Sequence, residues 1–230
     1  MTFYQRLLDE TASQRQDFQS IELIQHTVHH GVTPDLYAKY LEQAYHHVRF
    51  TVPLLELARD TCTAKDAAYT AALTEYVAEE SGHDEWILDD IKALGAGSEA
   101  VGGDIEAVRN GQGGFACRMM VAYAHYAIEH ISPYAMLGMV HVLEGMSVDL
   151  ADKAAGAIAA SFGDNPPNAF SYLTSHGALD TEHVQFFEDL VNGLGDAETK
   201  EIIVAAAKDF YVLFGNMFRE LAENITIKDA

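Results

Sequence analysis

The sequence predicts an all-α protein in which about seven helices form one bundle. Helix start and stop signals bound several long segments, and apolar positions within them recur at spacings of three and four residues. No stretch of useful length alternates with the period of a β-strand, and no internal repeat appears. A length of 230 residues suits one large domain or two small ones. Because the pattern before the glycine-rich stretch at 95–114 continues after it, we expect a single domain that spans residues 1–230.

The first half of the chain contains two long predicted helices. Thr33 is a typical N-cap and Pro34 suits the first helical position, which predicts a helix from 34 to about 57. One or two shorter helices precede it. The second long helix runs from about 65 to 94 and ends at a Gly-Ala-Gly sequence. Residues 95–114 are rich in glycine, so we expect a loop there with room for one short helical turn.

The second half contains four predicted helices, separated by clusters of proline, glycine and asparagine. The breaks are Ser132-Pro133, the sequence GDNPP at 163–167, and the sequence GLGD at 193–196. The helices are expected over 115–130, 133–161, 167–193 and 197–224.

The charge of the chain excludes several classes of partner. The formal net charge is −21, from 14 Lys+Arg against 35 Asp+Glu. Nucleic acids and anionic membrane surfaces would be repelled. The start is polar and does not resemble a signal peptide, and no window approaches the 18 or more uncharged apolar residues of a membrane span. We therefore expect a cytoplasmic protein.

The two cysteines do not suggest a covalent or zinc framework. Cys62 and Cys117 lie far apart and form no CxxC pair, which argues against a disulfide scaffold and a zinc knuckle. Cys117 is expected to be a buried or partly buried thiol.

Residues 175–187, SHGALDTEHVQFF, place polar side chains where the buried face of a helix should be. His176, Asp180 and His183 are four and then three residues apart, so they fall within an arc of roughly 60° on the helix. The apolar positions on either side, such as Leu173 and Phe187, continue the same spacing. This pattern indicates a helix face that points inward and carries metal-ligand chemistry at its centre.

Two further predicted helices carry acidic residues on the same kind of face. Glu80-x-x-His83 repeats the spacing of Asp180-x-x-His183, which would let both side chains reach one ion from adjacent turns. Glu144 is the single acid on the inward face of its helix and is the most natural bridging ligand.

One position remains open, because Glu79 also pairs with His83 at a spacing of four residues. The repeated spacing of three favours Glu80 as the ligand. His141 lies one turn before Glu144 and is a candidate hydrogen-bond partner for it, and His125 and His130 are candidates for similar outer positions.

The resulting set of donors combines carboxylate oxygen and imidazole nitrogen. Such a set suits ferrous iron or manganese, suits copper(I) poorly, and is too large for a closed four-coordinate zinc site. Three buried carboxylates without compensation would cost several kcal/mol each, whereas two divalent cations would supply +4 against −3. The predicted metal ligands are Glu80, His83, Glu144, His176, Asp180 and His183.

At these residues the chain resembles the heme-oxygenase-like di-iron oxidases and oxygenases, whose fold is shared with thiaminase II of the TENA/THI-4 type and with pyrroloquinoline-quinone synthase. The segment QHTVHHGVTPDLYAKYLEQAYHHVRF resembles the opening of that family, and the glutamate, ExxH and HxxxDxxH set resembles its ligands. The resemblance covers most of the chain. It implies a heme-oxygenase-like fold, often dimeric, and roles as iron ligands for the six residues.

The resemblance implies an O₂-activating non-heme enzyme that binds two Fe²⁺ per chain and oxidises a small organic substrate. Oxidative decarboxylation and N-oxygenation are among the family's reactions, and an electron donor is implied. Manganese, or a single bound metal, remains open. Thiaminase chemistry is not expected, because the stretch from His130 to Met136 lacks the nucleophilic cysteine of those enzymes.

Two alternatives remain. The first is a metal-free oxidase or small-molecule binding protein that resembles pyrroloquinoline-quinone synthase, in which inward histidines bind the substrate directly. The second is a heme protein, which would need a proximal histidine near the N-terminus and cations for the propionates. The segment offers only Lys39 and Arg49, so we expect its histidines to lie at the surface or at helix ends. These histidines are His26, His29, His30, His46 and His47.

Overall fold

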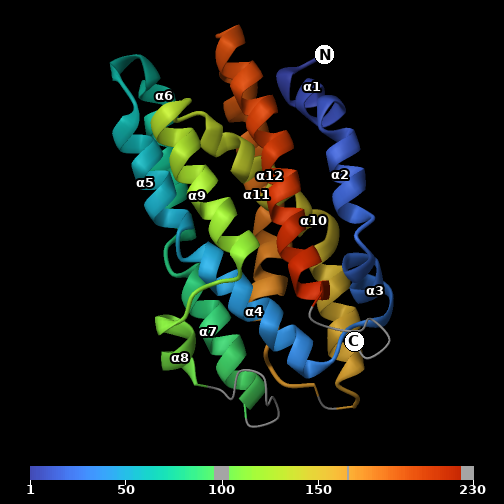
Figure 1. The fold of residues 1–230 in the computed structure, drawn as a ribbon. Helices are drawn as coiled ribbons and strands as arrows, with labels where there is room; N and C mark the ends of the chain where they lie inside the picture. Colours follow the sequence, from blue (N-terminus) through green and yellow to red (C-terminus); the bar gives the residue numbers. More distant parts are fainter. Residues whose placement is uncertain (96–103, 165, 224–230) are drawn as a thin grey trace.

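The computed structural model describes residues 1–95, 104–164 and 166–223, and for residues 176–182 it describes the helical backbone alone. The described residues form helices joined by turns and contain no strand, which confirms the predicted all-α class (Figure 1). In chain order the α-helices are α1 (Phe3–Glu10), α2 (Ala12–Gln19), α3 (Glu22–His30), α4 (Pro34–Val48), α5 (Thr51–Thr61), α6 (Ala67–Glu80), α7 (His83–Leu94), α8 (Ile105–Asn110), α9 (Phe115–His130), α10 (Ala135–Ser161), α11 (Ser171–Gly193) and α12 (Ala197–Glu223).

Two helices that we expected to be continuous are each divided. The predicted helix from 34 to about 57 is interrupted at Arg49-Phe50, between α4 and α5. The predicted helix from about 65 to 94 is interrupted at Ser81-Gly82, between α6 and α7. Gly82 has φ +93°, a left-handed conformation that glycine adopts without the steric cost of a Cβ atom. These breaks change the direction of the chain without changing the fold class.

The predicted start of α4 and the short helical turn in the glycine-rich stretch are both present. The Thr33 side chain accepts a hydrogen bond from the Leu36 backbone N–H at 3.4 Å, and Pro34 is the first helical residue. The short helix α8 lies within residues 95–114, and residues 96–103 of that stretch lie outside the described residues.

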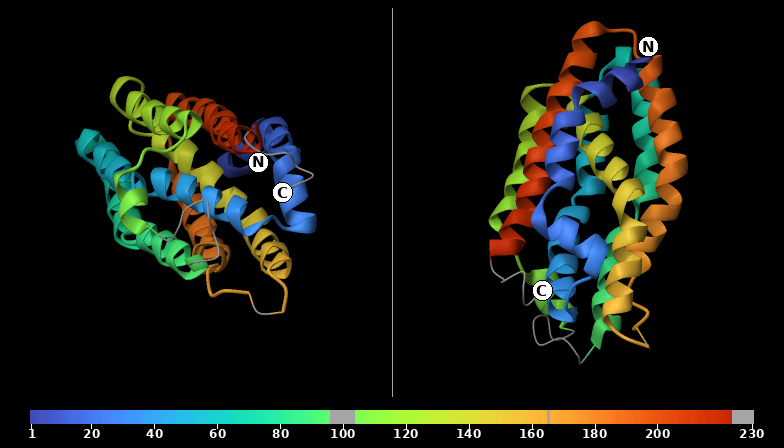
Figure 2. Two further views of the ribbon diagram at one scale, coloured as in Figure 1. Left: turned by 60° about the horizontal axis from the view of Figure 1, so that its bottom comes forward. Right: turned by 90° about the vertical axis from the view of Figure 1, so that its right-hand side faces the viewer.

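Helix α10 lies at the centre of the bundle and packs against α3, α9, α11 and α12. Figures 1 and 2 show an elongated body in which α12 runs along α9 on one side and α2 on the other, as their contacts also indicate. Gly138 permits a close approach of α10 to α12, since a Cβ atom there would lie only 2.6 Å from the backbone nitrogen of Ala207. The first turn of α10 is thereby held closely against α12.

A buried carboxylate on α7 fixes the start of α11. Asp90 accepts hydrogen bonds from the Ser171 backbone N–H at 3.0 Å, the Ser171 hydroxyl at 2.7 Å and the Tyr172 backbone N–H at 2.8 Å. Burial raises the pKa of Asp90, and these hydrogen bonds act in the opposite direction. Because free N–H groups at a helix start need acceptors, Asp90 ties α7 to the helix that carries His183.

The core is extensive and is built mainly of leucine, alanine, valine, isoleucine and aromatic side chains. Cys117 is buried within it, as expected, and burial raises the pKa of its thiol to about 11. No helix among the described residues combines the length and apolar character needed to cross a bilayer.

We predict that Asp90→Ala lowers the free energy of unfolding by about 1–2 kcal/mol, because the start of α11 loses its acceptor while its N–H groups stay largely buried. Urea unfolding followed by circular dichroism measures the change. Asp89→Ala is the matched control, since Asp89 is the exposed neighbour on the same helix. Equal stability of the two variants would show that Asp90 does not hold α11.

Candidate metal centre

Three of the six predicted ligands meet in space. One ligand atom each from Glu80, Glu144 and His183 lies within 4.8 Å of the other two. They come from the last residue of α6, the middle of α10 and the middle of α11. Their side chains are largely buried, with 12% of Glu80 exposed, 11% of Glu144 and 8% of His183. Among the described residues, this is the only group of three or more such side chains arranged closely enough to hold a metal ion.

His83 lies beside the group but is not part of it. Its Nδ1 atom lies 3.1 Å from Glu80 Oε2, and its ring stacks on Trp86 at 4.1 Å between centroids. The expectation that Glu80 and His83 lie on adjacent turns of a single helix is wrong, because the Ser81-Gly82 break separates them. The role of His83 as a ligand stays a prediction. The His83–Glu80 contact instead joins the two sides of that break, and such a contact can orient the Glu80 carboxylate.

His183 lies between two acids. Its Nε2 atom is 3.4 Å from Glu79 Oε2, and its Nδ1 atom is 3.8 Å from Glu144 Oε1. Glu79 is 40% exposed, whereas Glu80 is turned inward next to Glu144. Both acids of the Glu79-Glu80 pair therefore approach the site, from different sides of His183.

His176 and Asp180 fall in the part of α11 for which the structure describes the backbone alone. The helix is continuous through both positions, and they precede His183 by seven and three residues. Their side chains lie outside the described residues, so their roles as ligands remain predictions.

The donor chemistry of the described group fits iron. Two carboxylates and one imidazole supply hard oxygen and borderline nitrogen ligands, a combination that ferrous iron and manganese accept. Partial burial of the two carboxylates is costly without a cation. The three residues can hold one divalent ion and leave coordination positions open for other ligands.

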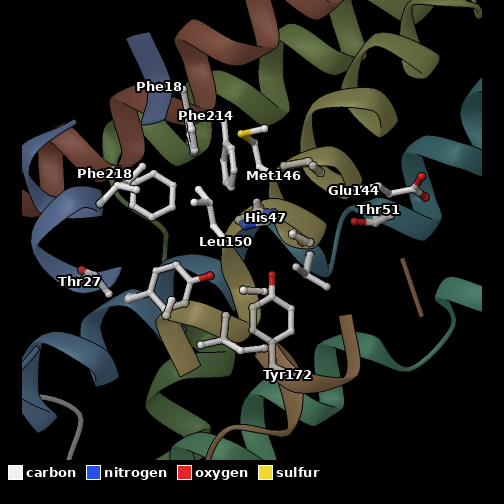
Figure 3. Close-up of a pocket in the computed structure, with 18 of the residues that line it drawn as sticks. Phe18, Thr27, His47, Thr51, Glu144, Met146, Leu150, Tyr172, Phe214 and Phe218 are labelled. Atoms are coloured by element: carbon white, nitrogen blue, oxygen red, sulfur yellow. The ribbon is translucent and has the colours of Figure 1, made fainter. Parts of the chain in front are cut away.

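A cavity of about 160 Å³ opens next to the two acids. Figure 3 shows Phe18, Phe214 and Phe218 grouped at one end, His47 near the middle, and Glu144 at the opposite side. Most lining residues are apolar, and among the described residues Glu80 and Glu144 are the only acidic ones that line the cavity. None of the described lining residues is a lysine or arginine that could pair with a heme propionate.

Tyr76 brings a polar group to the same cavity. It lies one turn before Glu80 and lines the cavity, and its buried hydroxyl has no hydrogen-bond partner among the described residues. Its ring packs edge-on against Phe186 at 5.1 Å between centroids. Burial raises the pKa of Tyr76, and the charge of Glu144 raises it further. The phenol therefore stays neutral and can donate a hydrogen bond into the cavity.

Two of the five N-terminal histidines differ from expectation. His46 and His47 are buried, not at the surface or a helix end, because α4 packs against α7, α9 and α12. His47 also lines the apolar cavity, which periodicity in the sequence did not indicate. His29 and His30 lie at the exposed end of α3, as expected, and His26 is partly exposed one turn before His30.

His141 has a different partner from the expected Glu144. Its Nε2 atom lies 3.4 Å from the Thr11 hydroxyl, and its ring stacks on Phe187 at 5.7 Å between centroids. Burial, together with the smaller effect of the Arg15 charge, lowers the pKa of His141 to about 4. The imidazole is therefore neutral in the folded protein at ordinary pH.

Comparison with known protein families shows to which family the chain belongs. Residues 38–214 match a family described as iron-containing redox enzymes. The chain belongs to this family. The match covers most of the chain, including Glu80, His83, Glu144, His176, Asp180 and His183. An oxidoreductase that contains iron agrees with the donor chemistry of the site.

Several solved structures have a fold similar to that of this iron-containing redox enzyme. A domain of unknown function with a heme oxygenase-like fold from Shewanella denitrificans is 18% identical, with a TM-score of 0.82 over 97% of this chain and 93% of that one. A TenA homolog from Pseudomonas syringae is 10% identical, with a TM-score of 0.74 over 96% and 93%. The heme oxygenase-1 of Synechocystis, solved in complex with heme, is 15% identical, with a TM-score of 0.73 over 97% and 94%.

These similarities confirm the predicted heme-oxygenase-like fold. At such low sequence identities, these similarities show a shared fold and do not show a shared function. No curated protein matches the chain.

We predict that acid destabilises the protein in part through His141. Its pKa is about 4 in the folded state against an ordinary value of 6.5, so below about pH 6.5 the unfolded chain binds a proton that the folded chain does not. The stabilisation is complete above pH 6.5 and is lost as the pH falls toward 4. Urea unfolding at about pH 7.5 and about pH 5.5 should show that His141 accounts for a loss of about 1 kcal/mol.

The variant His141→Gln removes this part of the pH dependence, and His130→Gln at the exposed end of α9 is its control. Arg15, Tyr4, Tyr211 and Thr11 face His141 and remain in both variants. An unchanged pH profile in His141→Gln would contradict the assignment.

Proposed function

We propose that this iron-containing redox enzyme is a non-heme di-iron oxidase or oxygenase that activates O₂ and oxidises a small, largely apolar substrate. The observation that carries the proposal is the meeting of Glu80, Glu144 and His183 within 4.8 Å, beside an apolar cavity of about 160 Å³. Metal ligands and a substrate-sized apolar space in direct contact are what such a reaction requires.

In this proposal Glu80, His83, Glu144, His176, Asp180 and His183 would hold two Fe²⁺ ions. Glu79 is suited to orient His183, since its Oε2 atom lies 3.4 Å from the Nε2 atom of that ring. When bound, the iron would supply open positions for O₂ and the electrons for its reduction. An external electron donor and a second copy of the chain complete the proposed set of partners.

The chain's own residues would set the conditions of the reaction. Apolar side chains around the cavity, such as Leu143, Leu150 and Met146, exclude water from the space next to the acids. The Tyr76 hydroxyl and the Tyr172 phenol lie on the cavity wall and can hydrogen-bond the polar part of a substrate. The aromatic group Phe18, Phe214 and Phe218 would then contact its apolar end.

The charge of the lining bears on the choice of substrate, since no lysine or arginine lines the cavity among the residues that the structure describes. These residues provide no cation to hold a carboxylate, so a carboxylate substrate would depend on the iron for its charge partner. Neutral and amine substrates meet no such requirement.

We predict that anaerobic Fe²⁺ reconstitution of the unaltered chain gives about two irons per chain and that Glu144→Gln binds iron at least about tenfold more weakly. The reason is that the amide lacks the negative charge that two cations need. Metal analysis after desalting measures the loss. Glu75→Gln on the exposed face of α6 is the matched control and should retain iron.

Circular dichroism would establish that Glu144→Gln is folded. Full iron retention in that variant would contradict the proposed ligand set. A Soret band after heme addition, together with failure to retain Fe²⁺, would replace the proposal with a heme protein.

A further inference from the structure

A second cavity, of about 100 Å³, lies on another side of Glu144. Side chains from α1, α2, α10, α11 and α12 enclose it, and Glu144 and Met146 line both cavities. Unlike the apolar cavity, it carries both signs of charge, two phenol hydroxyls and one imidazole among its described lining residues. Its polar lining consists of Tyr4, Arg15, His141, Glu144, Asp149 and Tyr211.

Arg15 and Asp149 line this cavity without pairing with each other. The Arg15 guanidinium makes no ion pair or hydrogen bond with any residue that the structure describes, although the chain has 35 acids for 14 basic residues. The Asp149 carboxylate accepts a hydrogen bond from Gln19 Nε2 at 3.1 Å. Opposite charges that face one small cavity are thus held apart, and each can take a partner of its own.

Two phenols lie within the influence of both charges. For Tyr4 and Tyr211, burial raises the pKa, Arg15 lowers it and Asp149 raises it, and the value for Tyr211 is about 12. Neither hydroxyl has a hydrogen-bond partner among the described residues. The two phenols are therefore available to donate to, or accept from, a ligand in the cavity.

We propose that this second cavity binds a small zwitterion, an α-amino acid with a short side chain, whose carboxylate pairs with Arg15 and whose ammonium group pairs with Asp149. The phenols of Tyr4 and Tyr211 supply additional hydrogen bonds. Leu8, Val184 and Phe187 form an apolar wall for the side chain.

The size of the cavity sets the size of the ligand. A volume of about 100 Å³ corresponds to about three water molecules, which matches glycine, alanine or serine and excludes large amino acids. The site does not depend on the proposed iron centre, because Arg15 and Asp149, its two charge partners, are not proposed metal ligands. Glu144 is shared with the iron centre only as a residue of the cavity wall. Binding can be measured whether or not iron is present.

Isothermal titration calorimetry with the full-length chain tests the proposal, using L-alanine as the probe. Propionate and ethylammonium are the matched half-ligands, since each keeps one charge of alanine at a similar size. We expect alanine to bind at least about tenfold more tightly than either half-ligand, because it alone satisfies both charges.

Variants assign the two contacts. Arg15→Gln and Asp149→Asn should each weaken alanine binding by about tenfold or more. Their controls are Arg59→Gln, whose arginine already pairs with Glu56 and Asp60, and Asp17→Asn on the exposed face of α2. Gly145→Leu should abolish binding without disturbing the backbone, because Gly145 lines the cavity and a Cβ atom there meets nothing within 4 Å.

Several outcomes would overturn the proposal. Alanine that does not bind to the folded chain at millimolar concentration would mean that water alone fills the cavity. If propionate binds as tightly as alanine, the second cavity is a site for an anion and not for a zwitterion. Alanine binding that survives both charge substitutions, or Gly145→Leu, would place the ligand elsewhere. Because Glu144 lines both cavities, alanine binding is measured with Glu144 unaltered and without iron, so the two proposals fail separately.

Discussion

Two carboxylates and an imidazole lie close together at the edge of an apolar cavity. The function of the site depends on how the negative charge of the two carboxylates is compensated. Glu80 and Glu144 are only 12% and 11% exposed, so water solvates them poorly. Leaving such carboxylates without a cation costs several kcal/mol each. A bound divalent cation would compensate this charge, and the family, described as iron-containing redox enzymes, supports iron as the proposed ion.

The fold brings these ligands together from distant parts of the sequence. Helix α10 carries Glu144 through the centre of the bundle, and the close packing at Gly138 fixes it against α12. Asp90 on α7 fixes the start of α11, which carries His183. The turn at Gly82 brings His83 back to the Glu80 carboxylate. The position of each ligand therefore depends on contacts made by residues that are not themselves ligands.

The spacing of three and four residues was sufficient to predict the fold class and the inward direction of Glu80, Glu144 and His183, because burial follows helical periodicity. It could not predict the Ser81-Gly82 break, since a glycine within an apolar helical pattern is compatible with either a continuous or a divided helix. The burial of His46 and His47 and the opposed charges of Arg15 and Asp149 depend on which helices pack together. That information is not contained in local sequence.

The most direct test is iron-edge anomalous diffraction from crystals grown anaerobically with Fe²⁺. We predict two anomalous peaks between α6, α10 and α11, with Glu80, Glu144 and His183 among the ligands. Iron found only elsewhere, such as at the exposed histidines of α3, with Glu80 and Glu144 free of metal, would contradict the central claim.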